Sequence, residues 1–271
     1  MRRTALRLLA TVALGLTTPA LAQDQAAAPA PTPAPAQAAV EPARPQLVLA
    51  VSIDQLSSDL FAQYREHFTG GFARLLTGAV FPSGFQSHAA TETCPGHSTI
   101  LTGAHPARSG IIANNWFNPA IARADKKIYC SEDLSDPAST PGNPVVSAGL
   151  LKVPTLGELM KAANPASRNV AVSAKDRAVV MMGGHKIDAG YWWKGSAFTT
   201  FKGRELTPAA KRANAAANAL LAKGAPALKA PAWCGSRDHA VAIGAGTVGT
   251  YRFALPKGAK ADNLPGAMAA E

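Results

Sequence analysis

A continuous apolar run near the start of the chain constrains the fold more than any other feature. The run spans Leu47–Ile53 and ends at Asp54. Apolar residues at successive positions are typical of a β-strand that is buried on both faces, because a half-exposed strand would alternate apolar with polar residues. Strands of this kind occur in sheets that helices cover on both sides. We therefore expect an α/β domain.

Helical and strand patterns alternate along the rest of the chain. Helical spacing is expected between Leu56 and Leu75 and over residues 95–102, 154–163 and 205–224, and short buried strands over residues 169–174 and 179–182. This alternation predicts a mainly parallel sheet flanked by helices. In such sheets ligands gather beyond the carboxyl ends of the strands, where Asp54 lies. The other interpretation of Asp54 is an N-cap of the following helix.

The N-terminus predicts export. Arg2 and Arg3 form a positive start, residues 5–16 are apolar, and Ala20-Leu21-Ala22 fits a cleavage site. Residues 1–22 are therefore interpreted as a signal peptide of a periplasmic or secreted protein. Residues 23–46 are rich in Ala and Pro, which is typical of an extended linker. The folded domain is expected over residues 47–271.

Composition excludes several classes of protein. The chain of 271 residues is 47% apolar, which argues against a disordered protein, and it contains no run of the roughly 18 apolar residues that a membrane span needs. Its 27 basic and 17 acidic residues give a net charge of +10. The basic residues are spread out and do not alternate with aromatic residues, so we expect no nucleic acid as a specific partner. The basic excess suits anionic substrates.

Three cysteines, Cys94, Cys130 and Cys234, allow at most one internal disulfide. Their spacing matches no zinc-finger pattern. Spacing alone does not determine the pairing. We favour Cys130 with Cys234, because Cys94 lies inside the motif described next.

The segment from His88 to Thr99 is dense in nucleophiles, and it opens a predicted helix with Thr93 near the N-cap. The start of a helix offers free N–H groups and a positive dipole, which favour a bound phosphate. A hydroxyl there can attack phosphorus if a divalent metal lowers its pKa.

Four motifs together resemble the alkaline phosphatase superfamily, within its nucleotide pyrophosphatase/phosphodiesterase-like branch. They are Asp54 after an apolar strand, Thr93-Cys94-Pro95-Gly96-His97, Thr102-Gly103-Ala104-His105-Pro106, and Gly110-Ile111-Ile112-Ala113-Asn114-Asn115. The Ser173-Ala174-Lys175-Asp176-Arg177 motif narrows the resemblance to the threonine-nucleophile bacterial alkaline phosphatases. The resemblance extends over residues 47–251 and implies an alkaline-phosphatase-like core.

The resemblance implies a site with two zinc ions that hydrolyses small phosphate monoesters, with diesters as a side activity. Thr93 would be the nucleophile, phosphorylated transiently, and a ligand of one zinc together with Asp54. Asn114 would donate its amide to a phosphoryl oxygen. Lys175 and Arg177 would bind the remaining oxygens, since their spacing on an extended stretch places both on one face.

Three alternatives compete at this motif. Thr91 is a second candidate nucleophile, although the family's motif falls on Thr93. The Cys94-Pro95 pair is similar to the sulfatase motif, but sulfatases need the pattern Cys-x-Pro-x-Arg and the order here is Cys-Pro-Gly-His. A serine hydrolase pair of His97 and Ser98 is disfavoured, because adjacent residues on a helix do not face each other.

The family takes further Asp and His ligands from its C-terminal half. Beyond Arg177 this chain offers His185 and the Asp238-His239 pair, and that pair comes too soon after Arg177 to match. The resemblance therefore implies an incomplete form, truncated at the C-terminus, which by itself neither holds two zinc ions tightly nor turns over substrate. The alternative function is a non-catalytic remnant that binds phosphate or a partner. The oligomeric state stays open.

Overall fold

The computed structural model describes residues 45–226, 231–249 and 257–258. The chain divides into two units, residues 1–50 and 51–271. The predicted signal peptide, residues 1–22, and nearly all of the predicted linker, residues 23–46, lie outside the described residues. The candidate site and all elements named below belong to the second unit.

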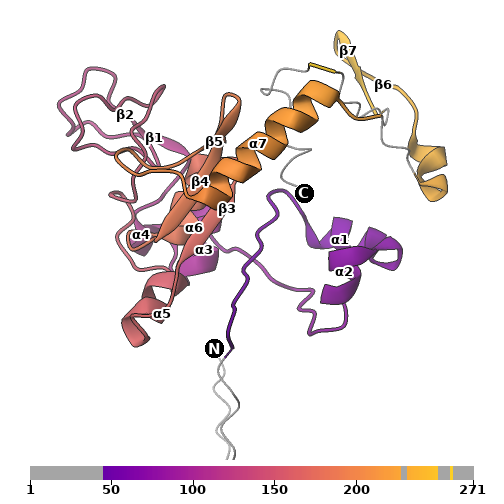
Figure 1. Cartoon of the computed structure of the whole chain (residues 1–271), viewed down its shortest axis with the longest axis horizontal. Coiled ribbons are helices and arrows are strands. Elements are labelled where there is room, and N and C mark those ends of the chain that lie inside the picture. The colour runs from indigo at the N-terminus through magenta and orange to yellow at the C-terminus, as the bar shows by residue number, and fades with distance from the viewer. Residues whose placement is uncertain (1–44, 227–230, 250–256, 259–271) are drawn as a thin grey trace, which may run out of the picture. The chain divides into compact units, whose positions relative to one another are not determined.

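This unit contains a three-stranded sheet (Figure 1). Strand β3 (Val170–Ser173) pairs in parallel with β4 (Ala189–Lys194), in a register that places Val170 opposite Ala189. Helix α6 (Asp176–Gly183) makes the connection between them. Strand β5 (Ala197–Thr199) lies antiparallel to β4, and helix α7 (Pro208–Lys223) packs against β5. The βαβ unit confirms the predicted α/β class.

Two short antiparallel hairpins lie outside this sheet. One pairs β1 (Asn115–Phe117) with β2 (Lys127–Tyr129), and the other pairs β6 (Val241–Ile243) with β7 (Gly246–Val248). The first hairpin begins immediately after Asn114, one of the predicted site residues. The position of Asn114 in the fold is therefore set by strand β1, which begins at the next residue.

The predicted helices form, with bounds that differ by a few residues. The N-terminal helical region is split into α1 (Ser58–Tyr64), the 3-10 turn η1 (Arg65–His67) and α2 (Gly70–Leu75). The other helices are α3 (Thr93–Thr102), α4 (Pro106–Ser109), α5 (Leu156–Ala163) and the 3-10 helix η2 (Ala232–Arg237). Helix α7 ends at Gly224, as the sequence predicts.

The core is formed where α3 packs against α6. Its buried members are Cys94, Ile111, Tyr129, Cys130, Ala148, Leu151, Val180 and Met181. The first six residues of α3, from Thr93 to Ser98, are all buried. The start of α3 is therefore held by packing rather than exposed to solvent.

The strand predicted over residues 179–182 is wrong, because this segment lies within α6. Val179, Val180 and Met181 are at most 1% exposed, since α6 packs on both the sheet and α3. A helix buried on several sides shows the same run of apolar residues as a buried strand. Helical periodicity was therefore hidden in the sequence.

The strand predicted over Leu47–Ile53 is also wrong within the described residues, where this segment has no strand pairing. Leu47, Leu49 and Val51 are 79%, 77% and 65% exposed. A strand requires a hydrogen-bonded neighbour, and none of the strands that the structure describes pairs with this segment. An apolar run indicates the capacity to form a buried strand but does not supply its partner.

The cysteine pairing favoured from the sequence, Cys130 with Cys234, is wrong as well. Cys94 forms the disulfide with Cys130, and Cys234 is a buried free thiol. Cys94 is the second residue of α3 and Cys130 follows β2, so the disulfide joins the start of the core helix to the first hairpin. Membership of a functional motif does not keep a cysteine from such a bond.

Asp188 joins β3 to α5 through two interactions. Its carboxylate accepts a hydrogen bond from the Asn169 N–H at 2.7 Å and forms an ion pair with the Lys161 ammonium at 2.6 Å. The Asn169 N–H, followed by Lys161, lowers the pKa of Asp188 below its ordinary 3.8. The folded protein therefore keeps this carboxylate ionised at a pH where the unfolded chain protonates it.

We predict that Asp188→Asn lowers the free energy of unfolding by about 1–2 kcal/mol at pH 7, because the ion pair and a charge-assisted hydrogen bond are lost. This difference in the free energy of unfolding between wild type and variant is fully present above about pH 3.8. It shrinks below that pH, as wild-type Asp188 takes up a proton. Urea unfolding at pH 7 and pH 3.5, followed by tryptophan fluorescence, measures both values. Asp125→Asn, at a half-exposed carboxylate, is the control. A deficit that grows on acidification would contradict the prediction.

Candidate active site

Asp54 and Thr93 meet at the start of α3. Thr93 is the first residue of this helix, and its hydroxyl donates a hydrogen bond to Asp54 Oδ2 at 2.9 Å. Asp54 does not cap the following helix, because Ser57 caps α1 by accepting from the Leu60 N–H at 3.1 Å. Of the two interpretations of Asp54, the structure excludes the N-cap, and the place in a catalytic site stays a prediction.

Lys175 and Arg177 come to the same place from α6. Lys175 is the N-cap residue of this helix and Arg177 its second residue. The expected extended stretch is thus wrong for Arg177, because Asp176 begins a helix, where an acid interacts favourably with the helix dipole. The Lys175 ammonium lies 3.9 Å from Asp54 Oδ2. The cation therefore reaches the site from a helix start instead of a strand.

The starts of two packed helices thus converge near Asp54. Thr93 opens α3, and Lys175 precedes the first turn of α6. Each helix start carries a partial positive charge and N–H groups without helical partners. Together with Lys175 and Arg177 they produce a positive potential that suits a bound anion.

Arg177 is held by a hydroxyl network behind the site. Its Nη1 lies 3.4 Å from the Tyr129 hydroxyl, which donates to Asp176 Oδ1 at 2.9 Å. Ser131 donates to the other oxygen of Asp176 at 3.2 Å. Burial, followed by the charge of Asp176, raises the pKa of Tyr129, so its hydroxyl stays protonated. The Arg177 Nε is buried and has no partner among the described residues.

Asn114 presents a defined end of its side-chain amide. Its Oδ1 accepts the Cys94 N–H at 2.8 Å, and its own main-chain N–H donates to the Glu92 carboxylate at 2.5 Å. Because Oδ1 is engaged, the Nδ2 amino group is the end available to a ligand. This is the donor that the sequence analysis expects.

Sequence reasoning missed Glu92, Tyr129, Ser131 and Asp176. Glu92 stands next to the recognised motif, and a glutamate at an N-cap position is unusual, so its type was the one available signal. Asp176 lies inside the Ser173–Arg177 motif but was given no role there, whereas Tyr129 and Ser131 lie far from both motifs and no local pattern marks them. They enter the site through the fold.

The serine hydrolase alternative at the motif finds no support in the geometry. His97 is buried, and its Nδ1 donates to the Thr93 carbonyl at 2.8 Å. Burial is the main reason that its pKa is lowered below 6.5. The Ser98 hydroxyl donates to the Pro95 carbonyl at 3.1 Å. His97 and Ser98 therefore both bond to main-chain carbonyls, as packed helix residues do.

Comparison with known proteins identifies the family. The sequence profile of type I phosphodiesterase / nucleotide pyrophosphatase matches residues 48–223. The chain belongs to this family. Alkaline phosphatase PhoK of Sphingomonas sp is 53% identical over 217 residues, which cover 79% of this chain and 39% of PhoK. Alkaline phosphatase PhoD of Zymomonas mobilis is 56% identical over 155 residues, or 57% of this chain and 27% of PhoD.

Crystal structures of alkaline phosphatase PafA share the fold. The wild-type structure is 29% identical with a TM-score of 0.56 and covers 65% of this chain and 36% of PafA. A second PafA structure, at 25% identity and a TM-score of 0.57, is a variant in which one threonine, one asparagine, one lysine and one arginine are replaced. The α/β fold of this family member is therefore alkaline-phosphatase-like. The chain spans less than two fifths of the length of these relatives.

The donor set for a metal is partial. Asp54 and Thr93 bring a carboxylate and a hydroxyl oxygen together, which suits one side of a zinc ion. The described residues contain no group of three or more His, Cys, Asp and Glu side chains that could hold a metal. His185 instead pairs with Glu158 at 3.3 Å, and Asp238 ends η2. The described part of the chain thus brings a carboxylate and a hydroxyl together without a complete set of metal ligands.

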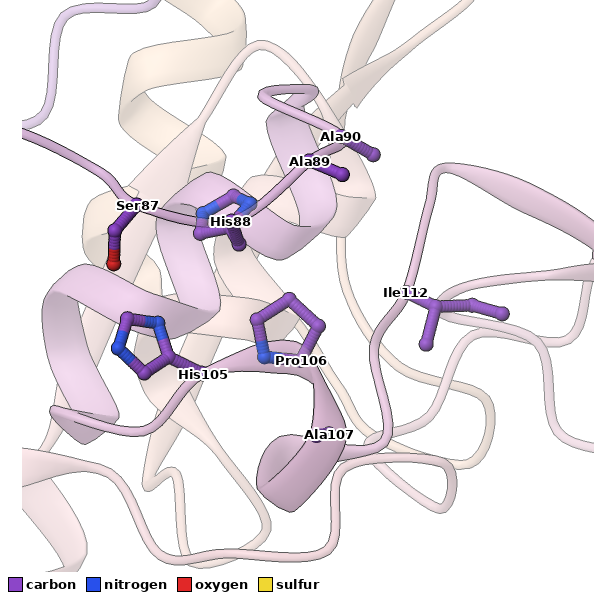
Figure 2. A pocket seen from close by; sticks show the side chains of 8 residues that line it. All are labelled: Ser87, His88, Ala89, Ala90, His105, Pro106, Ala107 and Ile112. Carbon is purple, nitrogen blue, oxygen red and sulfur yellow. The ribbon is translucent and has the colours of Figure 1, made fainter. Parts of the chain in front are cut away.

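A mainly apolar cavity of about 410 Å³ lies among the segments that lead into this site (Figure 2). Ala90 and Ile112, among its lining residues, precede Thr93 and Asn114 by a few positions; the others are Ser87, His88, Ala89, His105, Pro106 and Ala107. None of the predicted site residues lines it. The predicted phosphate site is therefore a separate, partly open surface at the two helix starts, where Lys175 and Asp54 are 52% and 42% exposed.

Proposed function

We propose that this chain carries the nucleophile of an exported, metal-dependent phosphatase that hydrolyses phosphate monoesters through a phosphothreonine intermediate. The observation that carries this proposal is the 2.9 Å hydrogen bond from the Thr93 hydroxyl to Asp54 at the buried start of α3. Lys175 lies beside the same carboxylate. The names of PhoK and PhoD, both alkaline phosphatases, support the reaction type.

Asp54 and Thr93 would hold one zinc ion, with the remaining ligands outside the described residues. When bound, the metal lowers the pKa of the nucleophile's hydroxyl and neutralises charge at the attacking oxygen. Asp54 orients the Thr93 Oγ1 through the hydrogen bond that it accepts. The threonine oxygen attacks phosphorus, the bond to the leaving oxygen breaks, and water later hydrolyses the phosphothreonine to release phosphate.

The three other site residues act on the equatorial oxygens of the phosphoryl group. Asn114 donates through its free Nδ2, and Arg177 through the donors that the Tyr129 network leaves unused. Lys175 adds a second positive charge. Fixed donors and cations that face the developing charge stabilise the transition state without reorganisation.

The PafA variant supports this set of four residues. The replaced threonine and asparagine of PafA are 21 positions apart, and its replaced lysine and arginine are two positions apart. Thr93 and Asn114 have the same separation in this chain, and so do Lys175 and Arg177. Agreement in residue type and spacing favours a common role.

Two features support export. Residues 1–22 have the pattern of a signal peptide. The Cys94–Cys130 disulfide suits an oxidising compartment such as the periplasm. Among the described residues no helix is both long and apolar enough to cross a membrane.

We predict that Thr93→Ala abolishes hydrolysis of an aryl phosphate by the protein as its gene encodes it, because the attacking oxygen is removed. The fold should persist, since a change at the start of a helix costs about 1 kcal/mol. Turnover and circular dichroism measure the two effects, and mass spectrometry of acid-quenched enzyme locates the phosphate. Thr91→Ala is the matched control. Unchanged turnover in Thr93→Ala, or phosphate on another residue, would refute the assignment.

We further predict that replacing Lys175 and Arg177 together by Ala reduces monoester hydrolysis by several orders of magnitude, and diester hydrolysis much less. Two cations match the extra negative charge of a monoester, and charge-assisted contacts of this kind are strong in a partly buried site. The measurement is kcat/KM on paired aryl mono- and diesters. Lys186→Ala, at an exposed lysine of the same region, controls for loss of net charge. Equal losses on both substrates would exclude a monoester preference from this pair.

A further inference from the structure

We propose that Glu92 and the Cys94–Cys130 disulfide are positioning groups that hold Asn114 as a fixed donor toward the phosphoryl group. The inference rests on the proposed function and adds the groups that fix the position of Asn114 in the site. Neither group needs to touch the substrate.

Three hydrogen bonds fix Asn114 at three different atoms. Its N–H donates to the Glu92 carboxylate at 2.5 Å, its side-chain Oδ1 accepts the Cys94 N–H at 2.8 Å, and its carbonyl accepts the Cys130 N–H at 3.0 Å. A flipped amide would place Nδ2 against the Cys94 N–H, donor against donor, which is unfavourable. Both the main chain and the amide orientation are therefore set before any ligand binds.

The disulfide links two residues that donate hydrogen bonds to Asn114. The two residues that donate to Asn114, Cys94 and Cys130, are the two that the disulfide joins. Both cysteines are fully buried in the core between α3 and α6. Breaking the disulfide lets the start of α3 and the end of β2 move independently. The hydrogen bonds to Oδ1 and to the carbonyl of Asn114 would then be lost together.

The Glu92 side chain bonds to Asn114 and does not cap its own helix. It occupies the N-cap position of α3, yet its side chain makes no capping hydrogen bond. Its carboxylate instead reaches a residue 22 positions away. Ser, Thr, Asp and Asn are preferred for capping because their side chains are short. The longer side chain of Glu92 spans the distance to Asn114, and Glu92 directly precedes the proposed nucleophile Thr93.

A purely structural role would destabilise the fold without acting through Asn114. The two roles are separated by variants made with and without Asn114→Ala. Residues that act through a common partner show non-additive losses, whereas independent ones add. Because both cysteines are fully buried, a reductant does not reach the disulfide in the folded protein, so Cys130→Ala removes the disulfide while keeping the main-chain N–H that donates to Asn114.

The first experiment measures kcat/KM for an aryl phosphate on the protein as its gene encodes it. We expect Glu92→Ala to lower it by about tenfold or more, mainly in kcat, and Glu92→Gln by less than about threefold, because an amide oxygen still accepts the Asn114 N–H. Cys130→Ala, which removes the disulfide, should lower kcat/KM by a factor similar to that of Glu92→Ala. In the Asn114→Ala background each change should lower kcat/KM by less than about twofold. Glu205→Ala, at an exposed glutamate, is the control.

The second experiment needs no turnover. Hydrogen exchange of the present chain, followed by NMR, reports the Asn114 and Cys94 main-chain N–H groups, with the Gly224 N–H that bonds to Leu220 as reference. Glu92→Ala should speed exchange at Asn114 by about tenfold or more and leave Gly224 unchanged. Absence of turnover in the wild-type protein would contradict the proposed function but not the positioning of Asn114 by Glu92. Unchanged exchange at Asn114, or fully additive losses in the Asn114→Ala background, would overturn the positioning role.

Discussion

The packing of α3 against α6 is the interaction on which the candidate site depends. Thr93 and Lys175 are 82 positions apart in the sequence, and both approach Asp54 because their helices start at the same end of this contact. The contact is apolar, with Cys94, Val180 and Met181 fully buried. The polar side chains at the helix starts are therefore held in place by apolar side chains that are buried within two turns of them.

The features that could be predicted from the sequence are local ones. The start of α3 and the polar residues around it follow from a short motif, and α7 follows from its Ala-rich composition and its terminal Gly224. The errors concern features that depend on distant partners. Residues 179–182 form a helix whose burial hides its period, Leu47–Ile53 lacks a neighbouring strand among the described residues, and Cys94 meets Cys130 through the fold. Asp54 and Thr93, which the resemblance assigns to one zinc ion, are joined by a hydrogen bond, and their role as ligands stays a prediction.

The cations and helix starts at the site favour binding of an anion. Asp54 supplies one negative charge beside Lys175, while His97 stays neutral because burial lowers its pKa. Two helix starts add partial positive charge. Asp54 alone therefore does not cancel the field of Lys175 and Arg177. Lys175 and Arg177 offer two cations to a doubly charged phosphate ester, while the Glu92 and Asp176 carboxylates bond to protein donors.

Asp176 is the residue that would upset this balance, because it lies between Lys175 and Arg177 in the sequence. Its two carboxylate oxygens accept from the Tyr129 and Ser131 hydroxyls, and are thereby directed toward the end of β2. The negative charge is thus stabilised on the side of the first hairpin, and the Tyr129 hydroxyl also contacts Arg177. One hydroxyl therefore restrains both the carboxylate and the guanidinium. Tyr129 directly precedes Cys130, whose N–H donates to Asn114. The same end of β2 thus orients the cation and the amide that would face the phosphoryl group, so that their relative positions are fixed by a single strand.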